Sequence, residues 1–531
     1  MRAQKFIILL LSLFISCACL SSCRPRSNAF VIAYSDNVST LDPIGSATVD
    51  AASERMRVLM FNSLVRKNEK FDYVGDLANF QRSDDGLTYT FTMRDGVKFH
   101  DGRALTSADA KYTLDTLIFG DLSSKSGKAA SFFETTDGNK QSYITSVEAP
   151  DAHTVILHLR KLFPQLIPNL VPISIIPQGS AGQQKDHPLG TGPFKFVSWD
   201  ASQQVLDLEA NQEYWEGAPH IPALRVRVIT DANAMQAELR SGRAQMAPLP
   251  TNLSPDSIKS LGQDLNLQVK QFPGANVNII TFNVTSAPLD KVQVRQAIAY
   301  AIDRESIVRD LYLGQAQIAH SIMPENSWSY SPGQKYSYDP EKAKHLLDEA
   351  GFRDPDGDGP QMRFPQPLVI KINANSVSAR NVTSVIQDYL KKVGIPLQID
   401  TVENNTLRNQ LPLGQFQMTY GQWVGGNTDP VFYKDLFEST EIPTRDRPSR
   451  NRSRYANRDL DRLIEEAINT LDRNKAAVTY AKIQDIVSRD LPLLPLWYQA
   501  NMVVARKGVG NITLRPDGDW EFVRQITPES K

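Results

Sequence analysis

The sequence predicts an α/β protein with more than one lobe, in which β-hairpins accompany alternating strands and helices. The chain has 531 residues, more than a single hydrophobic core usually holds. Short alternating stretches such as 89–93 end in turn residues, as hairpins require. Longer stretches with helical spacing, such as 292–312, alternate with strand-like runs through the rest of the chain.

The individual elements follow from residue spacing. Strands are predicted where apolar residues run or alternate and then meet turn residues: 30–34, 89–93 and 97–99. Helices are predicted where apolar residues recur at intervals of three and four: 51–64, 108–118, 292–312, 341–350, 377–393, 460–471 and 476–489. Arg94-Asp95-Gly96 is expected to join 89–93 and 97–99 as a hairpin, and Thr106 to cap the helix that follows.

Charge and hydropathy exclude two classes of partner. The chain has 58 basic and 59 acidic residues, a formal net charge of −1, whereas binding to nucleic acid needs a basic surface. No run after residue 30 is long and apolar enough to span a bilayer. We therefore expect no nucleic-acid partner and no spanning helix in the body of the protein.

The N-terminal segment has the layout of a secretory signal. Arg2 and Lys5 precede an apolar run over 6–15, and small residues follow. A retained membrane anchor is the alternative, but the run is shorter than the roughly 20 residues that a spanning helix needs. We expect residues 1–22 to be a signal peptide.

Leu20-Ser21-Ser22-Cys23 resembles a bacterial lipobox, in which the cysteine is acylated and becomes the first residue of the mature protein. Cleavage before Cys23 would leave 23–29 as a lipidated tether and remove Cys17 and Cys19, so that no disulfide is expected. The prediction is an exported protein held to a membrane by lipid on Cys23, facing the periplasm or the cell exterior.

The sequence contains no recognisable catalytic motif. Its seven histidines are scattered without a H-E-x-x-H pattern, and no serine sits in a nucleophile elbow. Asp354 to Gly359 resembles the start of a calcium loop, but position 365 is Pro rather than the closing Glu, which favours a solvated turn. We expect no enzymatic activity, no cofactor and no metal, although residue patterns alone leave a binding protein and an enzyme open.

Five segments, in order along the chain, resemble family 5 of the extracellular solute-binding proteins, the oligopeptide- and dipeptide-binding group. They cover nearly all of the mature chain: DDGLTYTFTMRDGVKFHDGRALTSADAKYTLDTL (84–117), PLGTGPF (188–194), Phe282-Asn283 followed by Asp290 and VRQAIAYAIDRESIV (294–308), YDPEKA (338–343) followed by LLDEAGF, and 455–463 leading to YAKIQ (480–484) and DLP (490–492).

The resemblance implies a periplasmic-binding-protein-like type II fold, with two lobes joined by a hinge and an extra β-rich domain. The implied boundaries are lobe one at 30–75, 189–275 and 503–531, the inserted β-rich domain at 76–188, and lobe two at 276–502. A ligand is then enclosed when the lobes close.

The resemblance also implies a function. The protein would be a monomeric substrate-binding lipoprotein of an ABC importer that captures peptides and delivers them to permease and ATPase subunits. One alternative is the same transport role for a non-peptide solute, namely an oligosaccharide, a metal complex or haem. The other is a periplasmic peptide-binding chaperone.

Residues 421–430 resemble the pocket loop of the peptide-binding members, in which an Asp about three residues after the Trp accepts the peptide ammonium group. Here that position is Gly426, and Asp429 matches a different acidic residue of the family. Dipeptide binders also place an Arg just before the helix that begins here near Val377, yet 372–378 contain none, and Arg380 lies inside the helix. We therefore expect weak dependence on free peptide termini.

Nine residues are candidates to contact the ligand: Tyr34, Asn283, Trp423, Gly425, Gly426, Asn427, Asp429, Trp497 and Tyr498. For the three aromatic residues after position 400, burial in the core is the alternative. A basic run with arginines at 445, 447, 450, 452 and 454 has two interpretations, an exposed loop or a contact with a carboxylate or permease near the cleft mouth.

Overall fold

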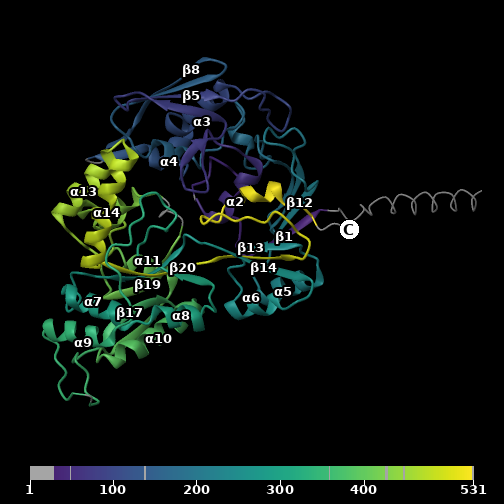
Figure 1. Ribbon diagram of the computed structural model, residues 1–531. Helices are drawn as coiled ribbons and strands as arrows, with labels where there is room; N and C mark the ends of the chain where they lie inside the picture. Colours follow the sequence, from purple (N-terminus) through teal and green to yellow (C-terminus); the bar gives the residue numbers. More distant parts are fainter. Residues whose placement is uncertain are drawn as a thin grey trace, which may run out of the picture.

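The computed structural model describes residues 29–47, 49–136, 139–357, 359–424, 429–445 and 449–528. Three larger sheets organise these residues, and each has its own place in the molecule (Figure 1). Within the described residues, no helix has both the length and the apolar character needed to cross a membrane.

The first lobe is built on a seven-stranded sheet whose strands come from distant parts of the chain. Their order is β10 (Phe194–Asp200), β11 (Val205–Ala210), β12 (Ala223–Val228), β1 (Phe30–Tyr34), β13 (Met246–Pro248), β21 (Asn501–Arg506) and β14 (Leu267–Phe272). β1 runs parallel to β12 and β13, an arrangement that is common for strands buried on both faces of a sheet. Ile32 faces a core shared with α2 (Ala51–Met60), whereas Ala33 faces α5 (Ala232–Ser241) and α6 (Pro255–Gly262).

The second lobe is built on a six-stranded sheet. Its order is β16 (Ala316–Ile318), β20 (Leu493–Gln499), β15 (Val277–Phe282), β19 (Met418–Trp423), β17 (Leu368–Asn373) and β18 (Leu397–Val402). One face packs on α7 (Val292–Ala301), α9 (Pro340–Glu349) and α10 (Val377–Lys392). The other face packs on α12 (Phe432–Phe437), α13 (Arg458–Asn469) and α14 (Arg473–Asp490).

The helix expected over 292–312 is interrupted. α7 ends at Ala301 and α8 (Arg304–Asp310) begins after Asp303, whose carboxylate accepts a hydrogen bond from the Ser306 amide at 2.9 Å. An Asp at this place caps a new helix better than it continues an old one. The other predicted helices form, with ends that shift by a few residues.

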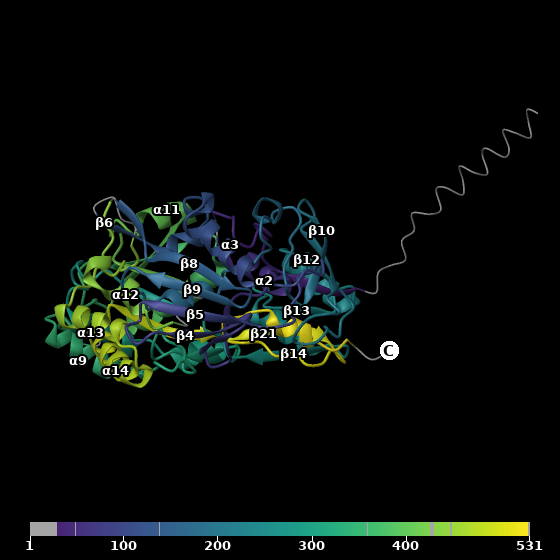
Figure 2. The ribbon, with the colours of Figure 1, turned by 90° about the horizontal axis from the view of Figure 1, so that it is seen from above.

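A four-stranded antiparallel sheet forms the β-rich region: β4 (Ala78–Arg82), β5 (Thr88–Met93), β9 (Thr154–Leu159) and β8 (Ile144–Asp151). The view from above shows it beside the first lobe (Figure 2), and the hydrophobic core under β1 continues beneath it. The predicted strand at 97–99 is wrong: only an isolated bridge joins Lys98 to Ala104, and β5 pairs with β4 and β9 instead. The predicted capping of α3 (Ser107–Ile118) by Thr106 is confirmed, with a reciprocal contact from Asp109.

Two crossings connect the sheets of the two lobes, one between β14 and β15 and one between β20 and β21. They lie against each other, since the Gln499 amide donates to the Asn276 carbonyl at 3.0 Å. A Cβ on Gly274 would lie 1.9 Å from the Gln499 carbonyl oxygen, so only glycine fits here. The two crossings therefore form one narrow connection between the lobes.

Candidate functional site

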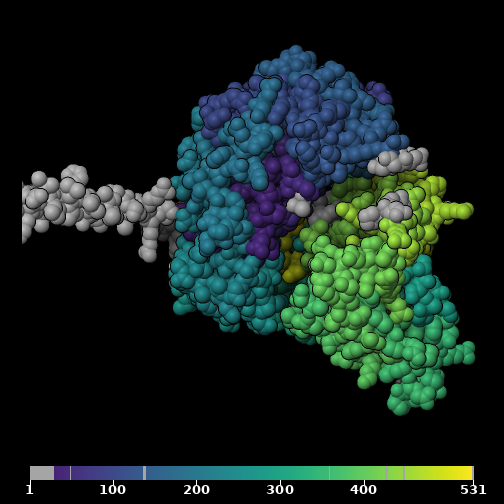
Figure 3. Space-filling model, turned by 180° about the vertical axis from the view of Figure 1, so that it is seen from behind, coloured from purple at the N-terminus to yellow at the C-terminus, as the bar shows by residue number. Residues whose placement is uncertain are grey.

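A cavity of about 460 Å³ lies on the second lobe. It sits beyond the carboxyl ends of β17 and β19, where Asn373 and Trp423 line it. The carboxyl ends of parallel strands are a common place for ligands in α/β folds. Figure 3 shows the surface hollowed between the purple part of the first lobe and the green part of the second.

The wall of the cavity is rich in amide and hydroxyl groups. The polar side chains that line it are those of Asn278, Thr281, Tyr312, Asn373, Ser376, Ser378, Asn404, Arg408, Thr419, Tyr420, Gln422, Arg450, Arg452, Ser453 and Gln499. Ser376 and Ser378 bring the N-terminal end of α10 to the wall, and Asn404 and Arg408 come from α11 (Asn404–Gln410). Such a wall can hold a polar ligand through many hydrogen bonds.

Two buried donors of this wall lack a hydrogen-bond partner in the part of the chain that the structure describes: the indole Nε1 of Trp423 and the guanidinium Nε of Arg452. The Trp423 ring packs on Phe432 with centroids 4.6 Å apart, and the Arg450 guanidinium lies 5.9 Å from its centroid. Buried donors without partners are costly, so both are suited to an acceptor brought by a ligand.

Arg408, Arg450 and Arg452, which we call the cavity arginines, form a cluster of like charge. Burial lowers the pKa of Arg452, and the charges of Arg450 and Arg408 lower it further. Arg450 is paired with Asp435 at 3.0 Å, but no described residue that lines the cavity is acidic. The electrostatics of the cavity therefore favour an anionic group over a cationic one.

Asp429, a sequence candidate, does not line the cavity but joins the two lobes. Its carboxylate accepts a hydrogen bond from the hydroxyl of Tyr73, on β3 (Tyr73–Gly75) of the β2–β3 hairpin, in which β2 is Val65–Lys67. Its other oxygen accepts from the Val431 amide at 2.9 Å. Trp423, another sequence candidate, lines the cavity. Gly425, Gly426, Asn427 and Cys23 lie outside the described residues.

A second contact between the lobes lies beside the first. Asp72, next to Tyr73, forms an ion pair with Arg473 at the start of α14. The Arg473 guanidinium also lies 4.7 Å from the ring centroid of Trp328. The β2–β3 hairpin therefore touches the second lobe through two neighbouring residues.

The structure places Tyr34 and Asn283 away from the cavity wall. Tyr34 is fully buried in the first lobe, where its hydroxyl accepts from Arg55 at 2.6 Å and its ring packs on Trp520. Asn283 follows β15 and donates to the carbonyl groups of Gly414 (3.0 Å) and Phe416 (2.9 Å). Both side chains fix local backbone geometry.

Trp497 and Tyr498 lie in the core of the second lobe, which was the alternative for both. Trp497 is fully buried against Tyr312, with ring centroids 5.1 Å apart. The Tyr498 hydroxyl lies 2.5 Å from the Ser321 carbonyl oxygen and 2.6 Å from that of Met323. Neither residue lines the cavity, although Tyr312, the neighbour of Trp497, does.

Sequence patterns missed most of the wall. Arg450 and Arg452 belong to the basic run of the sequence, for which a contact with a carboxylate was one of the two interpretations. Asn278, Asn373 and Asn404 gave no signal, because single amides in strands and helix starts are common everywhere. Arg380 donates to the Ala374 carbonyl and does not line the cavity.

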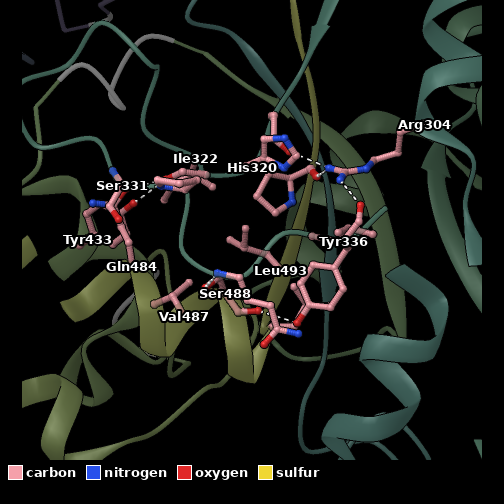
Figure 4. Close-up of a pocket in the computed structure, with 17 residues that line it drawn as sticks. Arg304, His320, Ile322, Ser331, Tyr336, Tyr433, Gln484, Val487, Ser488 and Leu493 are labelled. Carbon is pink, nitrogen blue, oxygen red and sulfur yellow. Dashed lines mark hydrogen bonds between the residues drawn. The ribbon is translucent and has the colours of Figure 1, made fainter. Parts of the chain in front are cut away.

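A second, much smaller cavity lies deep in the second lobe (Figure 4). Its volume, about 20 Å³, leaves room for about one water molecule. Arg304 on its wall donates to the backbone carbonyls of Ala319 (2.6 Å) and Tyr336 (2.6 Å). Burial and the nearby Arg304 lower the pKa of His320 to about 4. This cavity is too small for a solute.

The family model described as bacterial extracellular solute-binding proteins, family 5, middle region, matches residues 72–443. The chain is 28% identical to the oligopeptide-binding protein AppA of Bacillus subtilis, over 97% of this chain and 96% of that protein. It is 29% identical to heme-binding protein A of Haemophilus influenzae, over 85% of this chain and 83% of that protein.

Two solved structures share the fold. The structure of AppA from Bacillus subtilis in complex with a nonapeptide has a TM-score of 0.70 and 26% identity, covering 94% of this chain and 98% of that one. NikZ from Campylobacter jejuni in complex with Ni(L-His) has a TM-score of 0.73 and 25% identity, covering 94% and 99%. The predicted type II fold, with two α/β lobes and an extra domain, is thus confirmed, and the chain belongs to the bacterial extracellular solute-binding proteins of family 5.

Proposed function

We propose that this protein is the substrate-binding component of an ABC importer, which captures a peptide between its lobes and delivers it to a permease. The observation that carries the proposal is the polar cavity of the second lobe, beside direct contacts from the first lobe through Tyr73 and Asp72. A ligand on this wall would be covered by the first lobe when the lobes close.

The expected domain boundaries, 30–75, 189–275 and 503–531 for lobe one, 76–188 for the insert and 276–502 for lobe two, belong to this proposal. The narrow double crossing at Gly274 and Gln499 supports a hinge, because few residues there need to change conformation. The candidate ligand contacts of this proposal are Trp423, Gly425, Gly426, Asn427 and Asp429.

Peptides are the first choice of ligand. The relative AppA is named for oligopeptides and was solved with a nonapeptide. A wall of amides and hydroxyls suits backbone groups, which alternate donors and acceptors at every residue. A non-peptide solute is the second candidate, because other relatives are named for haem or were solved with Ni(L-His).

Export and lipid attachment complete the proposal. The apolar run followed by Leu20-Ser21-Ser22-Cys23 supports a lipid anchor at Cys23, which would keep the protein near its permease and ATPase. Radiolabelled palmitate should enter the wild-type protein and not Cys23→Ala. Equal labelling of the two would contradict the anchor.

Small-angle scattering with and without a peptide mixture tests the transport role. The radius of gyration should fall when peptide is added, and the peptide should be recovered unchanged after dissociation. Recovery of cleaved peptide would contradict a role in transport. An unchanged radius on saturation would contradict capture by closure.

A further inference from the structure

We infer that the cavity of the second lobe is a carboxylate-binding site, in which Arg452 and the Trp423 indole receive an anionic group of the ligand. The inference deepens the proposed function, on which it rests, by naming the ligand chemistry. It predicts a ligand that carries a carboxylate and needs no ammonium group at this wall, so it keeps the sequence-based expectation of weak dependence for the amino end of a peptide and replaces it for the carboxyl end.

The buried atoms of the wall that lack a partner are all of one kind among the described residues. They are Trp423 Nε1 and Arg452 Nε, and both are donors. Trp497 and Trp520 also bury an indole Nε1 without a partner among the described residues, but neither lines the cavity, whereas a donor on its wall can receive an acceptor from a ligand. Since the Arg452 guanidinium is planar, a carboxylate matches its geometry with two parallel hydrogen bonds.

The charge of the wall points the same way. Arg408 and Arg450 line the cavity close enough to Arg452 that their charges act on it, and burial of Arg452 adds to the cost. Only Arg450 has a carboxylate partner among the described residues, namely Asp435. An anion bound among the cavity arginines would relieve this repulsion, whereas an ammonium group would add to it.

The helix α10 points its N-terminal end at the cavity. Ser376 caps this helix, accepting from the Ala379 amide at 3.1 Å, and Ser376, Ser378 and Ala379 all line the cavity. The first turn of a helix presents N–H groups without partners inside the helix and the positive end of its dipole. The helix therefore favours the same sign of ligand charge as the arginines do.

The sequence offers an independent reason to expect no ammonium site here. The resemblance places an acidic residue of the peptide-binding members at position 426, which is Gly in this chain. Asp429, the acidic residue of the resembling loop, is engaged with Tyr73 and the Val431 amide. We therefore expect the cavity to bind the carboxylate of a ligand rather than its ammonium group.

The test uses two mixtures of N-acetylated tetrapeptides with the same sequences, one ending in a free carboxylate and one in a carboxamide. Titration calorimetry on the purified full-length protein should give roughly tenfold tighter binding for the acid mixture. Arg452→Gln should reduce this ratio to within twofold. Arg462→Gln, which changes an exposed arginine of α13 paired with Glu466, should leave the ratio unchanged.

Thermal unfolding without ligand separates binding from folding. If Arg452 serves the ligand, Arg452→Gln should unfold at the same temperature as the wild type or higher, because a buried unpaired charge is removed. A lower unfolding temperature together with a retained acid preference would overturn the inference. Arg452→Lys keeps the charge without the planar fork and should retain only part of the preference.

The outcomes distinguish the two proposals. Equal binding of acid and amide mixtures overturns the carboxylate site and leaves peptide transport standing. If neither mixture binds, the proposal of peptide transport is wrong. Citrate, glutarate and benzoate are then used to test whether the cavity binds a carboxylate. The site is supported if one of these anions stabilises the wild type against unfolding and does not stabilise Arg452→Gln. It is overturned if none of them stabilises the wild type.

Discussion

Two groups of arginines, one in each lobe, show opposite arrangements. In the first lobe, Arg66, Arg515 and Arg524 form what we call the paired cluster. Arg66 lies 2.8 Å and Arg524 3.1 Å from Glu216, and Arg515 lies 2.9 Å from Glu521. In the second lobe, the cavity arginines have a single carboxylate partner among the described residues, and the charges of Arg408 and Arg450 act on Arg452.

The difference distinguishes charged groups that stabilise the folded chain through ion pairs from charged groups that are suited to bind an anionic ligand. A buried arginine between carboxylates contributes to a unique packing, and removal of one partner leaves a charge without compensation. A half-buried arginine without a partner costs stability in the empty protein, and the cost is recovered only when an anion binds. Four experiments test this distinction, from the largest expected effect to the smallest.

Glu216→Ala should have the largest effect, because it removes the carboxylate that Arg66 and Arg524 share. We expect the free energy of unfolding to fall by about 3 kcal/mol in urea denaturation. Glu209→Ala, on an exposed position of β11, is the control and should stay within about 0.5 kcal/mol of the wild type. A matching loss in both variants would mean that pairing is not the cause.

The pH dependence of stability tests another buried group that has hydrogen-bond partners within the first lobe, His100. Burial lowers its pKa to about 4, and its ring meets the Gly192 carbonyl at 3.0 Å and the Gly190 amide at 3.4 Å. Because the unfolded chain binds a proton near pH 6.5, the contribution of neutral His100 is present above that pH. As pH falls from 6.5 to 4, up to about 3 kcal/mol should be lost.

Chemical denaturation at pH 7 and pH 5 should show this loss in the wild type and a smaller one in His100→Gln. The glutamine cannot take up a proton, so its remaining pH dependence reports the other groups. A variant with the full wild-type pH dependence would exclude His100 as the cause.

Tyr73→Phe tests the contact that joins the two regions. It removes the hydroxyl that donates to Asp429 across the lobes and keeps the ring. We expect peptide affinity to weaken about fivefold, since one hydrogen bond between the lobes is lost, with little change in the free energy of unfolding. Tyr300→Phe, away from the cleft in the core under α9, is a matched hydroxyl deletion that should leave affinity unchanged.

Arg452→Gln should have the smallest effect on the empty protein. Its free energy of unfolding is expected to equal that of the wild type or to exceed it by up to about 1 kcal/mol. This result would contrast with the loss in Glu216→Ala and complete the comparison. A loss of similar size in both variants would place Arg452 with the structural arginines.

Much of the fold could be predicted from local sequence, and the failures have physical causes. The strand at 30–34 and the helices at 377–393 and 476–489 follow from spacing and caps, which act over a few residues. The strand expected at 97–99 does not form, because β5 finds better partners in β4 and β9 from other parts of the chain. Residue spacing cannot report such distant pairing.

The candidate site shows the same division. Trp423 was predicted from the resemblance and lines the cavity, whereas Tyr34, Trp497 and Tyr498 are buried elsewhere. An aromatic residue near a strand end has the same local pattern whether it faces a cavity or the core. Burial depends on what packs against the strand, and that is a property of the whole molecule.

The sequence by itself determined the family, the order of the elements and the basic character of the stretch around Arg450, because these depend on residue identity and spacing. Only the tertiary structure decided which residues share a wall. Asn278 and Asn373 lie far apart in the chain and meet because β15, β19 and β17 are neighbours in one sheet, and α11 and the loop before α13 bring Arg408 and Arg452 to the same wall. Strand order is set by packing of whole faces, so the charge and the unpaired donors of the cavity emerge only when the lobe has folded.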